Sequence, residues 1–397
     1  MANLAINALT AKTPTTTDLI PVADPTTGIA GKSTVKQLYE SNIFAVSVAY
    51  TGIAPAPFGA IVSAKSGSQS GSTLTIPDGV TIETFVYSNG YSTTLTYENL
   101  AGIRSTFTMA NWASLTSLSF PALAFTGVNF DPNTMAALTT LSTPALTYVG
   151  NNFQPNAMAS LTTLSTPLLS YVGGNYLPSN MGAITSLSAP ALAYIGGSYQ
   201  PQPGGTSLTT ISTPALAYVG VNYYPNQMSG LTTLSAPALV FIGGFFFPNV
   251  LASLTSINMP ALTSIGVNLA RTAFTSGNIQ PLTMASLTTL TFPAIEVIGD
   301  VSGISIKIVS GTGALSTFTL GSTLRRVNAD VQLTSCALLV ASVDGVLVRL
   351  AALNGTGLTT TYNNKNVTIT GTSATPSATG LSAKATLVAR GCTVTHN

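Results

Sequence analysis

The chain has 397 residues, of which 6% are charged, far below the roughly 25% of typical soluble domains. Its net charge of +2 includes no basic cluster beyond Arg325 and Arg326, which argues against a nucleic-acid partner. Disordered chains combine low hydrophobicity with high charge, so the mean hydropathy of +0.43 and the low charge argue against disorder. Glycine and proline interrupt the most apolar stretch, 239–254, so we expect no membrane insertion.

Residues 1–42 form a polar segment with no basic start and no long apolar run, so we expect no secretory signal and synthesis in a cytoplasm. The stretch DLIPVADPTTGIAGKSTVKQLY resembles the N-terminal segment of bacteriophage tail-fibre and tail-associated proteins. In those, an Asp-Leu-x-Pro-x-Asp-Pro sequence runs into Gly-Lys-x-Thr-x-x-x-Leu. The resemblance implies a virion-anchoring arm that contacts other tail proteins through Asp18, Asp24, Pro25, Lys32 and Leu38. A merely solvated polar arm is the alternative.

Residues 43–111 contain stretches such as STLTIPDGV and STTLTYENL, which predict irregular strands. They lead into a region of repeats at 112–300. A stack of repeats needs a cap over its first open turn, and we expect this segment to supply it.

The repeats in 112–300 have a period of about 23 residues. One whole unit, residues 161–183, reads LTTLSTPLLSYVGGNYLPSNMGA, and prolines mark the copies at Pro121, Pro144, Pro167, Pro190, Pro214, Pro237, Pro260 and Pro293. The leucine pair, the proline and the apolar-x-x-apolar-Gly step resemble the leucine-rich repeats of bacterial surface proteins. The expected fold is mainly β: a leucine-rich-repeat-like β-solenoid of about eight rungs with a small α/β C-terminal cap.

Each column of the repeat has an expected place. Leu161, Leu164 and Leu169 are expected in the core, with Met181 as a filler of gaps, while serine and threonine point outward. Glycines at the position of Gly173 are expected at corners with unusual backbone angles. By the resemblance, the aromatic column that contains Tyr176 points inward.

A second aromatic column comprises Phe125, Tyr148, Tyr171, Tyr194, Tyr218 and Phe241. Each member stands between two inward positions three residues apart, so we expect it to point outward and to form an exposed strip. The strip could contact a host-surface glycan or protein, contact a neighbouring subunit, or only stabilise the stack. The insertion between Gly266 and Pro281, with Arg271 and Phe274, is a further candidate contact.

Residues 301–397 change period. Val343, Val346, Leu347 and Leu350 have helical spacing, NVTIT predicts a strand, TGLSAKATLVARG a second helix that ends at Gly391, and CTVTHN a last strand. This succession resembles the C-terminal end of many phage fibres and surface repeat proteins, with Cys392 in place of their tryptophan. The two cysteines, Cys336 and Cys392, are expected to be buried free thiols.

The residues give little support for catalysis. His396 is the only histidine, Asp131 is the only acid between residues 113 and 295, and Glu83 and Glu98 are a weak candidate pair. We expect no enzyme, metal or cofactor. The resemblances imply a phage virion structural protein, a homotrimeric tail fibre or receptor-binding protein assembled in the host cytoplasm. A bacterial surface adhesin and a glycan depolymerase are the alternatives.

Overall fold

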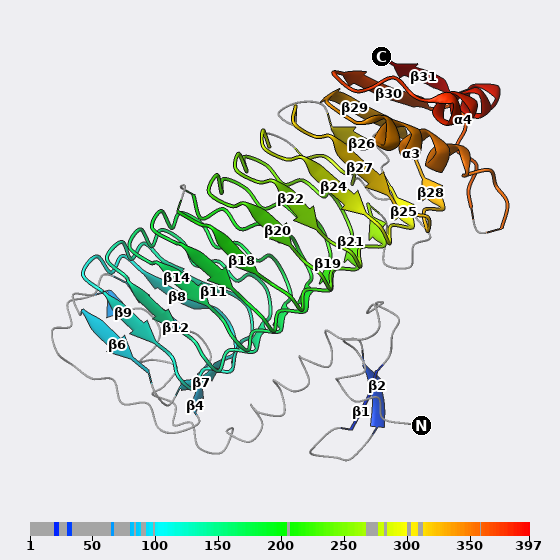
Figure 1. The fold of residues 1–397 in the computed structure, drawn as a ribbon. Coiled ribbons are helices and arrows are strands. Elements are labelled where there is room, and N and C mark those ends of the chain that lie inside the picture. Colours follow the sequence, from blue (N-terminus) through cyan, green and yellow to red (C-terminus); the bar gives the residue numbers. More distant parts are fainter. Residues whose placement is uncertain are drawn as a thin grey trace. The chain divides into compact units, whose positions relative to one another are not determined.

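The fold is a β-solenoid of about 12 turns, in which parallel strands about 23 residues apart stack on one another (Figure 1). The computed structural model describes residues 20–23, 30–33, 65–66, 80–82, 85–88, 93–97, 100–204, 207–266, 277–281, 284–299, 303–308, 313–357 and 359–397. The predicted class is confirmed, but the turns exceed the expected eight, because turns at both ends lack the proline signature. Two compact units divide the chain: an N-terminal unit (Met1–Leu208 with Ser212–Pro214) and a C-terminal unit (Thr209–Ile211 with Ala215–Asn397).

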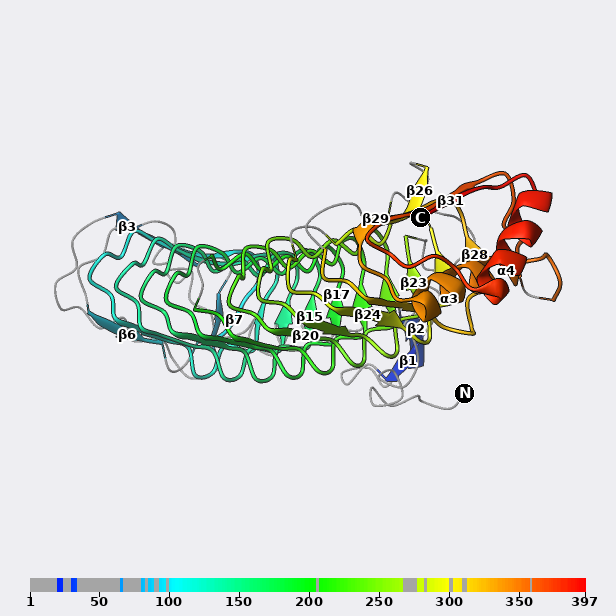
Figure 2. The same ribbon diagram turned by 45° about the horizontal axis from the view of Figure 1, so that its top comes forward.

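The N-terminal unit contains three parallel sheets, whose strands lie side by side in successive turns (Figure 2). The first has β4 (Val80–Ile82), β7 (Leu100–Ile103), β10 (Phe125–Thr126), β13 (Tyr148–Val149), β15 (Tyr171–Val172) and β17 (Tyr194–Ile195). The second has β6 (Thr94–Thr96), β9 (Ser117–Ser119), β12 (Thr140–Ser142), β14 (Thr163–Ser165) and β16 (Ser186–Ser188). The third has β3 (Lys65–Ser66), β5 (Phe85–Ser88), β8 (Phe107–Ala110) and β11 (Phe130–Asn133). β1 (Ile20–Ala23) and β2 (Ala30–Ser33) form a separate antiparallel pair.

The C-terminal unit repeats this scheme and then adds two helices. Its strands in the first, 11-stranded sheet are β19 (Tyr218–Val219), β21 (Phe241–Ile242), β23 (Ser264–Ile265), β25 (Val297–Ile298) and β28 (Arg326–Val327). Its second has β20 (Thr233–Ser235), β22 (Ser256–Asn258), β24 (Thr289–Phe292) and β27 (Thr317–Leu320). The last has β26 (Ile304–Ile308), β29 (Asp330–Cys336), β30 (Asn366–Gly371) and β31 (Thr393–His396), with α3 (Val340–Ala351) before β30 and α4 (Ala378–Ala389) before β31. β18 (Thr210–Ser212) spans the boundary of the units.

The core is built from the predicted columns. Leu161, Leu169 and Met181 are fully buried, and so are their counterparts in the other turns. The inward aromatic column is confirmed as well: the rings of Phe130 and Phe153 stack with centroids 5.4 Å apart, and those of Phe153 and Tyr176 with centroids 5.1 Å apart. A side chain repeated once per turn therefore meets its own kind at about the spacing of adjacent strands.

In the glycine column the unusual backbone angle that we expected is confirmed at Gly266, whose φ is +67°, but several other members are required for a different reason. Gly150, Gly173 and Gly196 do not have positive φ; instead, a Cβ at each would overlap the carbonyl oxygen of the glycine one turn earlier. A second column also has the left-handed conformation, with φ between 53° and 60°: Asn111, Thr134, Ala157, Asn180, Gln227 and Val250. The sequence gives little sign of this corner, because residues of several kinds occupy it.

The C-terminal elements follow the prediction. The spacing of Val343, Val346 and Leu350 places them on the buried side of α3. α4 ends before Gly391, whose φ of +78° fits a helix stop. Both cysteines are buried free thiols, as expected.

Candidate functional site

The second aromatic column does not form the exposed strip that we expected. The exposed fraction is 3% for Tyr148, 1% for Tyr171 and 4% for Tyr218, and Phe125 and Phe241 are also buried, while Tyr194 is half-buried. The rings of Tyr148, Tyr171 and Tyr194 stack in register, with centroids 4.9 Å apart and planes nearly parallel. The pattern of inward neighbours predicted an exposed strip, but it did not predict that the rings stack and cover one another.

This burial changes what the column can do. Phe125, Tyr148 and Tyr171 form a small cluster of their own, with Ala124 and Tyr194 packed against it. Burial raises the pKa of the Tyr194 hydroxyl above its usual value. A ring stack with exposed fractions this small offers no broad surface to a ligand, so the column is a structural ladder.

The other predicted contact residues fall mostly outside the described residues. This holds for Arg271 and Phe274 in the insertion and for Asp18, Asp24, Pro25 and Leu38 in the N-terminal arm. Glu83 and Glu98, the weak candidate pair of catalytic acids, also lie outside the described residues. Lys32 lies in β2, where it pairs with Pro21 of β1.

Polar ladders along the turns were not anticipated. The Oδ1 atom of Asn152 accepts hydrogen bonds from the backbone N–H of Asn175, at 2.8 Å, and from its Nδ2, at 3.2 Å. The Oδ1 atom of Asn129 accepts one from the backbone N–H of Asn152 at 3.1 Å. The spacing of these asparagines, 23 residues apart, could have revealed the ladder in the sequence. Each side chain accepts a hydrogen bond from a backbone N–H of the next turn.

A face of exposed and half-buried serine and threonine side chains is the regular polar surface of the N-terminal unit. We name as the hydroxyl face the first and third residues of β9, β12, β14 and β16: Ser117, Ser119, Thr140, Ser142, Thr163, Ser165, Ser186 and Ser188. The residue between each pair is a buried leucine. Parallel register places equal positions side by side, as with Thr140 beside Ser117 and Thr163 beside Ser186.

The C-terminal unit repeats this arrangement. Thr233 of β20 pairs with Ser256 of β22, which pairs with Thr289 of β24, and Thr289 pairs in turn with Thr317 of β27. The threonines just before these strands form hydrogen bonds between successive turns. The Thr255 hydroxyl donates to the carbonyl oxygen of Thr232 at 3.1 Å. The outward side chains are uncharged, so the surface offers hydrogen-bond donors and acceptors without a fixed charge.

Charged groups in the described residues lie elsewhere. Asp131 is half-buried in β11, and burial raises its pKa although a hydrogen bond from Gln154 lowers it. His396 Nε2 lies 3.0 Å from Lys384 Nζ, an arrangement in which the imidazole accepts from the ammonium group. Among the residues that the structure describes, no three His, Cys, Asp or Glu side chains gather as a metal site requires.

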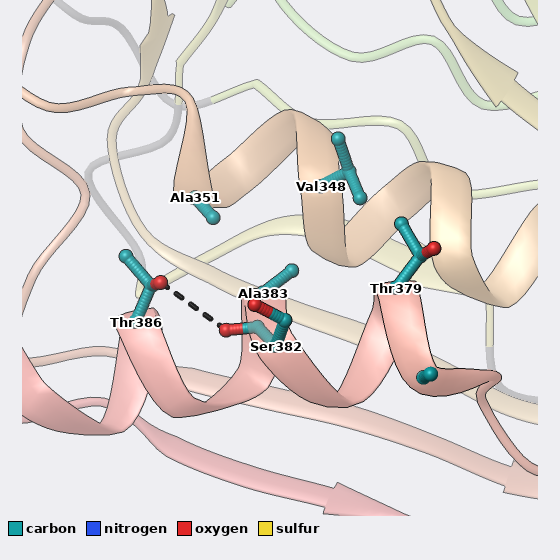
Figure 3. Close-up of a pocket in the computed structure, with 7 residues that line it drawn as sticks. Val348, Ala351, Thr379, Ser382, Ala383 and Thr386 are labelled. Carbon is teal, nitrogen blue, oxygen red and sulfur yellow. Dashed lines mark hydrogen bonds between the residues drawn. The ribbon is translucent and has the colours of Figure 1, made fainter.

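A shallow groove of about 520 Å³ runs between α3 and α4 (Figure 3). Val348 and Ala351 of α3 face Thr379, Ser382 and Ala383 of α4 across it. Its lining is small and uncharged, so it brings together no acid, base or nucleophile pair.

Neither helix in the described part of the chain has the length and apolar character of a membrane span. Comparison of the chain with protein-family models, with curated proteins and with solved structures found no match.

Proposed function

We propose that the protein is a non-enzymatic structural component of a bacteriophage particle, a tail fibre or receptor-binding protein that contacts the host surface. The observation that carries the proposal is the hydroxyl face, an array of uncharged serine and threonine side chains in register on stacked parallel strands. Thr140, Thr163 and Ser165 are exposed, and the other members are half-buried. Residues 1–42 anchor the chain to other tail proteins, and the homotrimer common to fibres is its expected assembly.

A neutral host glycan is the ligand that suits this face. Sugar hydroxyls pair with serine and threonine hydroxyls, which both donate and accept hydrogen bonds. Each such contact is weak, but the face repeats the same pair of positions in every turn, and repeated weak contacts on one rigid support add up to useful avidity. The resemblance of both chain ends to phage fibre segments supports the same assignment.

Two arginines on the hydroxyl face test the proposal. Thr140 and Thr163 are both exposed, so Thr140→Arg with Thr163→Arg leaves the core unchanged and places bulky charges on the face. Particles that carry this double variant are expected to adsorb to the host at least about tenfold more slowly. Adsorption is measured as free particles remaining against time.

Val221→Arg is the matched control, because Val221 is 45% exposed and lies outside the hydroxyl face. The control is expected to adsorb normally. Normal adsorption of the double variant would rule out the hydroxyl face as the receptor surface. Absence of the protein from purified particles would rule out the virion assignment itself.

A further inference from the structure

The loop that follows α3 holds the amide side chain of Asn354 in place by hydrogen bonds. The chain enters the loop at Leu353, whose carbonyl oxygen accepts a hydrogen bond from the backbone N–H of Tyr362 at 2.9 Å. Inside the loop, the Thr359 hydroxyl donates to the carbonyl oxygen of Thr356 at 2.8 Å. The loop is therefore closed by its own hydrogen bonds, although Asn354 is exposed to solvent.

Two donors meet at the Oδ1 atom of Asn354. The backbone N–H of Thr356 donates to it at 3.0 Å, and the Thr356 hydroxyl donates to it at 2.6 Å. A hydrogen bond from an asparagine side chain to the backbone amide two residues later forms an Asx-turn, in which the side chain folds over the intervening peptide group. The turn therefore brings the side-chain carbonyl carbon of Asn354 toward the backbone nitrogen of Gly355.

Glycine at position 355 leaves this nitrogen accessible to the amide carbon. Its φ is +82°, and a Cβ at this position would lie 2.6 Å from Thr361 Oγ1. Both the angle and the nearby oxygen favour a residue without a side chain, and such a residue does not shield its own nitrogen. A second Asn-Gly pair of the sequence, Asn89 and Gly90, lies outside the described residues.

We infer that Asn354 is a site of spontaneous deamidation, at which the loop converts its own asparagine to aspartate and isoaspartate. The nitrogen of Gly355 gives its proton to water and bonds to Cγ of Asn354, and the bond from Cγ to Nδ2 breaks. Nδ2 takes up a proton from water and leaves as ammonia, so the product is a cyclic imide. A further water molecule adds to either carbonyl carbon of the imide and opens it, which leaves a carboxylate.

The two donors act on the oxygen at which charge develops. When the Gly355 nitrogen bonds to Cγ of Asn354, this carbon becomes tetrahedral and its oxygen, Oδ1, carries a negative charge. The N–H and the hydroxyl of Thr356 already donate to that oxygen, so they stabilise the charge without rearrangement. The closed loop also holds the reacting atoms near one another, which lowers the entropy cost of forming the ring.

Deamidation changes the charge of a chain that has few charged residues. It replaces a neutral amide with a carboxylate, so the formal net charge falls by one from +2. The isoaspartate form also adds a carbon atom to the backbone between Leu353 and Gly355. The modified loop belongs to the C-terminal unit, and its reaction does not depend on the proposed role in a virion.

Incubation of the purified full-length chain at neutral pH, followed by peptide mapping with mass spectrometry, measures the reaction at Asn354. Aspartate and isoaspartate are expected to accumulate at this position, and ion exchange separates these acidic forms from the unchanged protein. The same chain unfolded in guanidinium chloride is the reference. It is expected to react more slowly, because it lacks the turn and its donors. A folded chain that reacts more slowly than the unfolded chain would overturn the inference.

Thr356→Val tests the hydroxyl donor, because it removes the hydroxyl and keeps the size of the side chain. The rate at Asn354 is expected to fall about three- to tenfold, a modest effect because water replaces part of the lost hydrogen bond in an exposed loop. Thr356→Ser retains the hydroxyl and is the matched control, which should react as the unchanged protein does. Equal rates in the valine and serine variants would contradict the inference. Circular dichroism checks that each variant is folded, and the rate at Asn89 in the same samples corrects for differences in incubation.

Discussion

At the scale of single residues, some glycines of the repeat are required by close packing between turns, and others are not. Gly173 lies against the carbonyl oxygen of Gly150, and an added Cβ would overlap that oxygen. Backbone cannot move aside as a flexible side chain can, so Gly173→Ala must push two turns apart. We expect a loss of about 2–3 kcal/mol in the free energy of unfolding, measured by chemical denaturation.

Gly182 provides the matched comparison. A Cβ there would meet nothing within 4 Å, and alanine already stands 23 residues earlier at Ala159. Gly182→Ala is expected to leave stability unchanged or raise it by about 0.4–1 kcal/mol, because the unfolded chain loses freedom. Equal effects of the two changes would contradict the close approach as the reason for the glycine column.

Val250 occupies a left-handed corner that suits its side chain poorly. Its φ is +53°, and a β-branched residue in this region costs about 1–2 kcal/mol. Asn180 adopts nearly the same angle, +54°, and its Nδ2 donates to Asn156 Oδ1 at 2.8 Å. Val250→Asn is therefore expected to raise the free energy of unfolding by about 1 kcal/mol, measured by denaturation. The reverse change, Asn180→Val, should destabilise, and a gain from both would refute the argument.

At the scale of elements, the aromatic ladder links strand spacing to stability. Tyr171 is sandwiched between Tyr148 and Tyr194, with centroids 4.9 Å away on either side. Tyr171→Ala removes both contacts and leaves a cavity, so we expect a loss of about 3–5 kcal/mol, measured by thermal and chemical unfolding. Leu168→Ala, at an exposed position, should change stability by less than about 0.5 kcal/mol. A Tyr171→Ala variant with unchanged stability would show that the ladder is not structural.

The sequence predicted most elements, but it did not predict how residues pack against the neighbouring turn. Leucine, methionine and proline columns predicted the stacked turns because the core repeats the same side chain in each turn. The burial of Tyr171 and the reason for Gly173 could not be predicted in the same way. Both depend on atoms one turn away: a neighbouring ring in one case and a carbonyl oxygen in the other.

The turns outside the proline repeats were not predicted, because strand pairing does not require the residues that mark the repeat. β7 and β8 precede the first repeat and β26 follows the last one, yet each pairs in parallel with strands of the stack. Parallel pairing needs backbone register and a buried side chain, not a particular proline. Terminal turns of a solenoid are free to lose the consensus that makes the interior turns visible in the sequence.

At the scale of the whole molecule, the N-terminal segment and the solenoid are expected to act separately. β1 and β2 pair only with each other in the sheet order, so no described sheet of the stack includes them. Deleting residues 1–42 should therefore leave the solenoid folded. Far-UV circular dichroism of the truncated chain is expected to show the same β content per residue, and its melting temperature should match that of the full chain within a few degrees.

The same truncation separates anchoring from folding. If residues 1–42 attach the chain to other tail proteins, particles assembled with only the truncated chain should lack it, although the purified chain is folded. Western blotting of purified particles measures incorporation, and circular dichroism of the purified chain measures its folding. Normal incorporation would contradict the anchor. Loss of both folding and incorporation would show instead that residues 1–42 stabilise the solenoid, since an anchor alone has no effect on the melting temperature of its own chain.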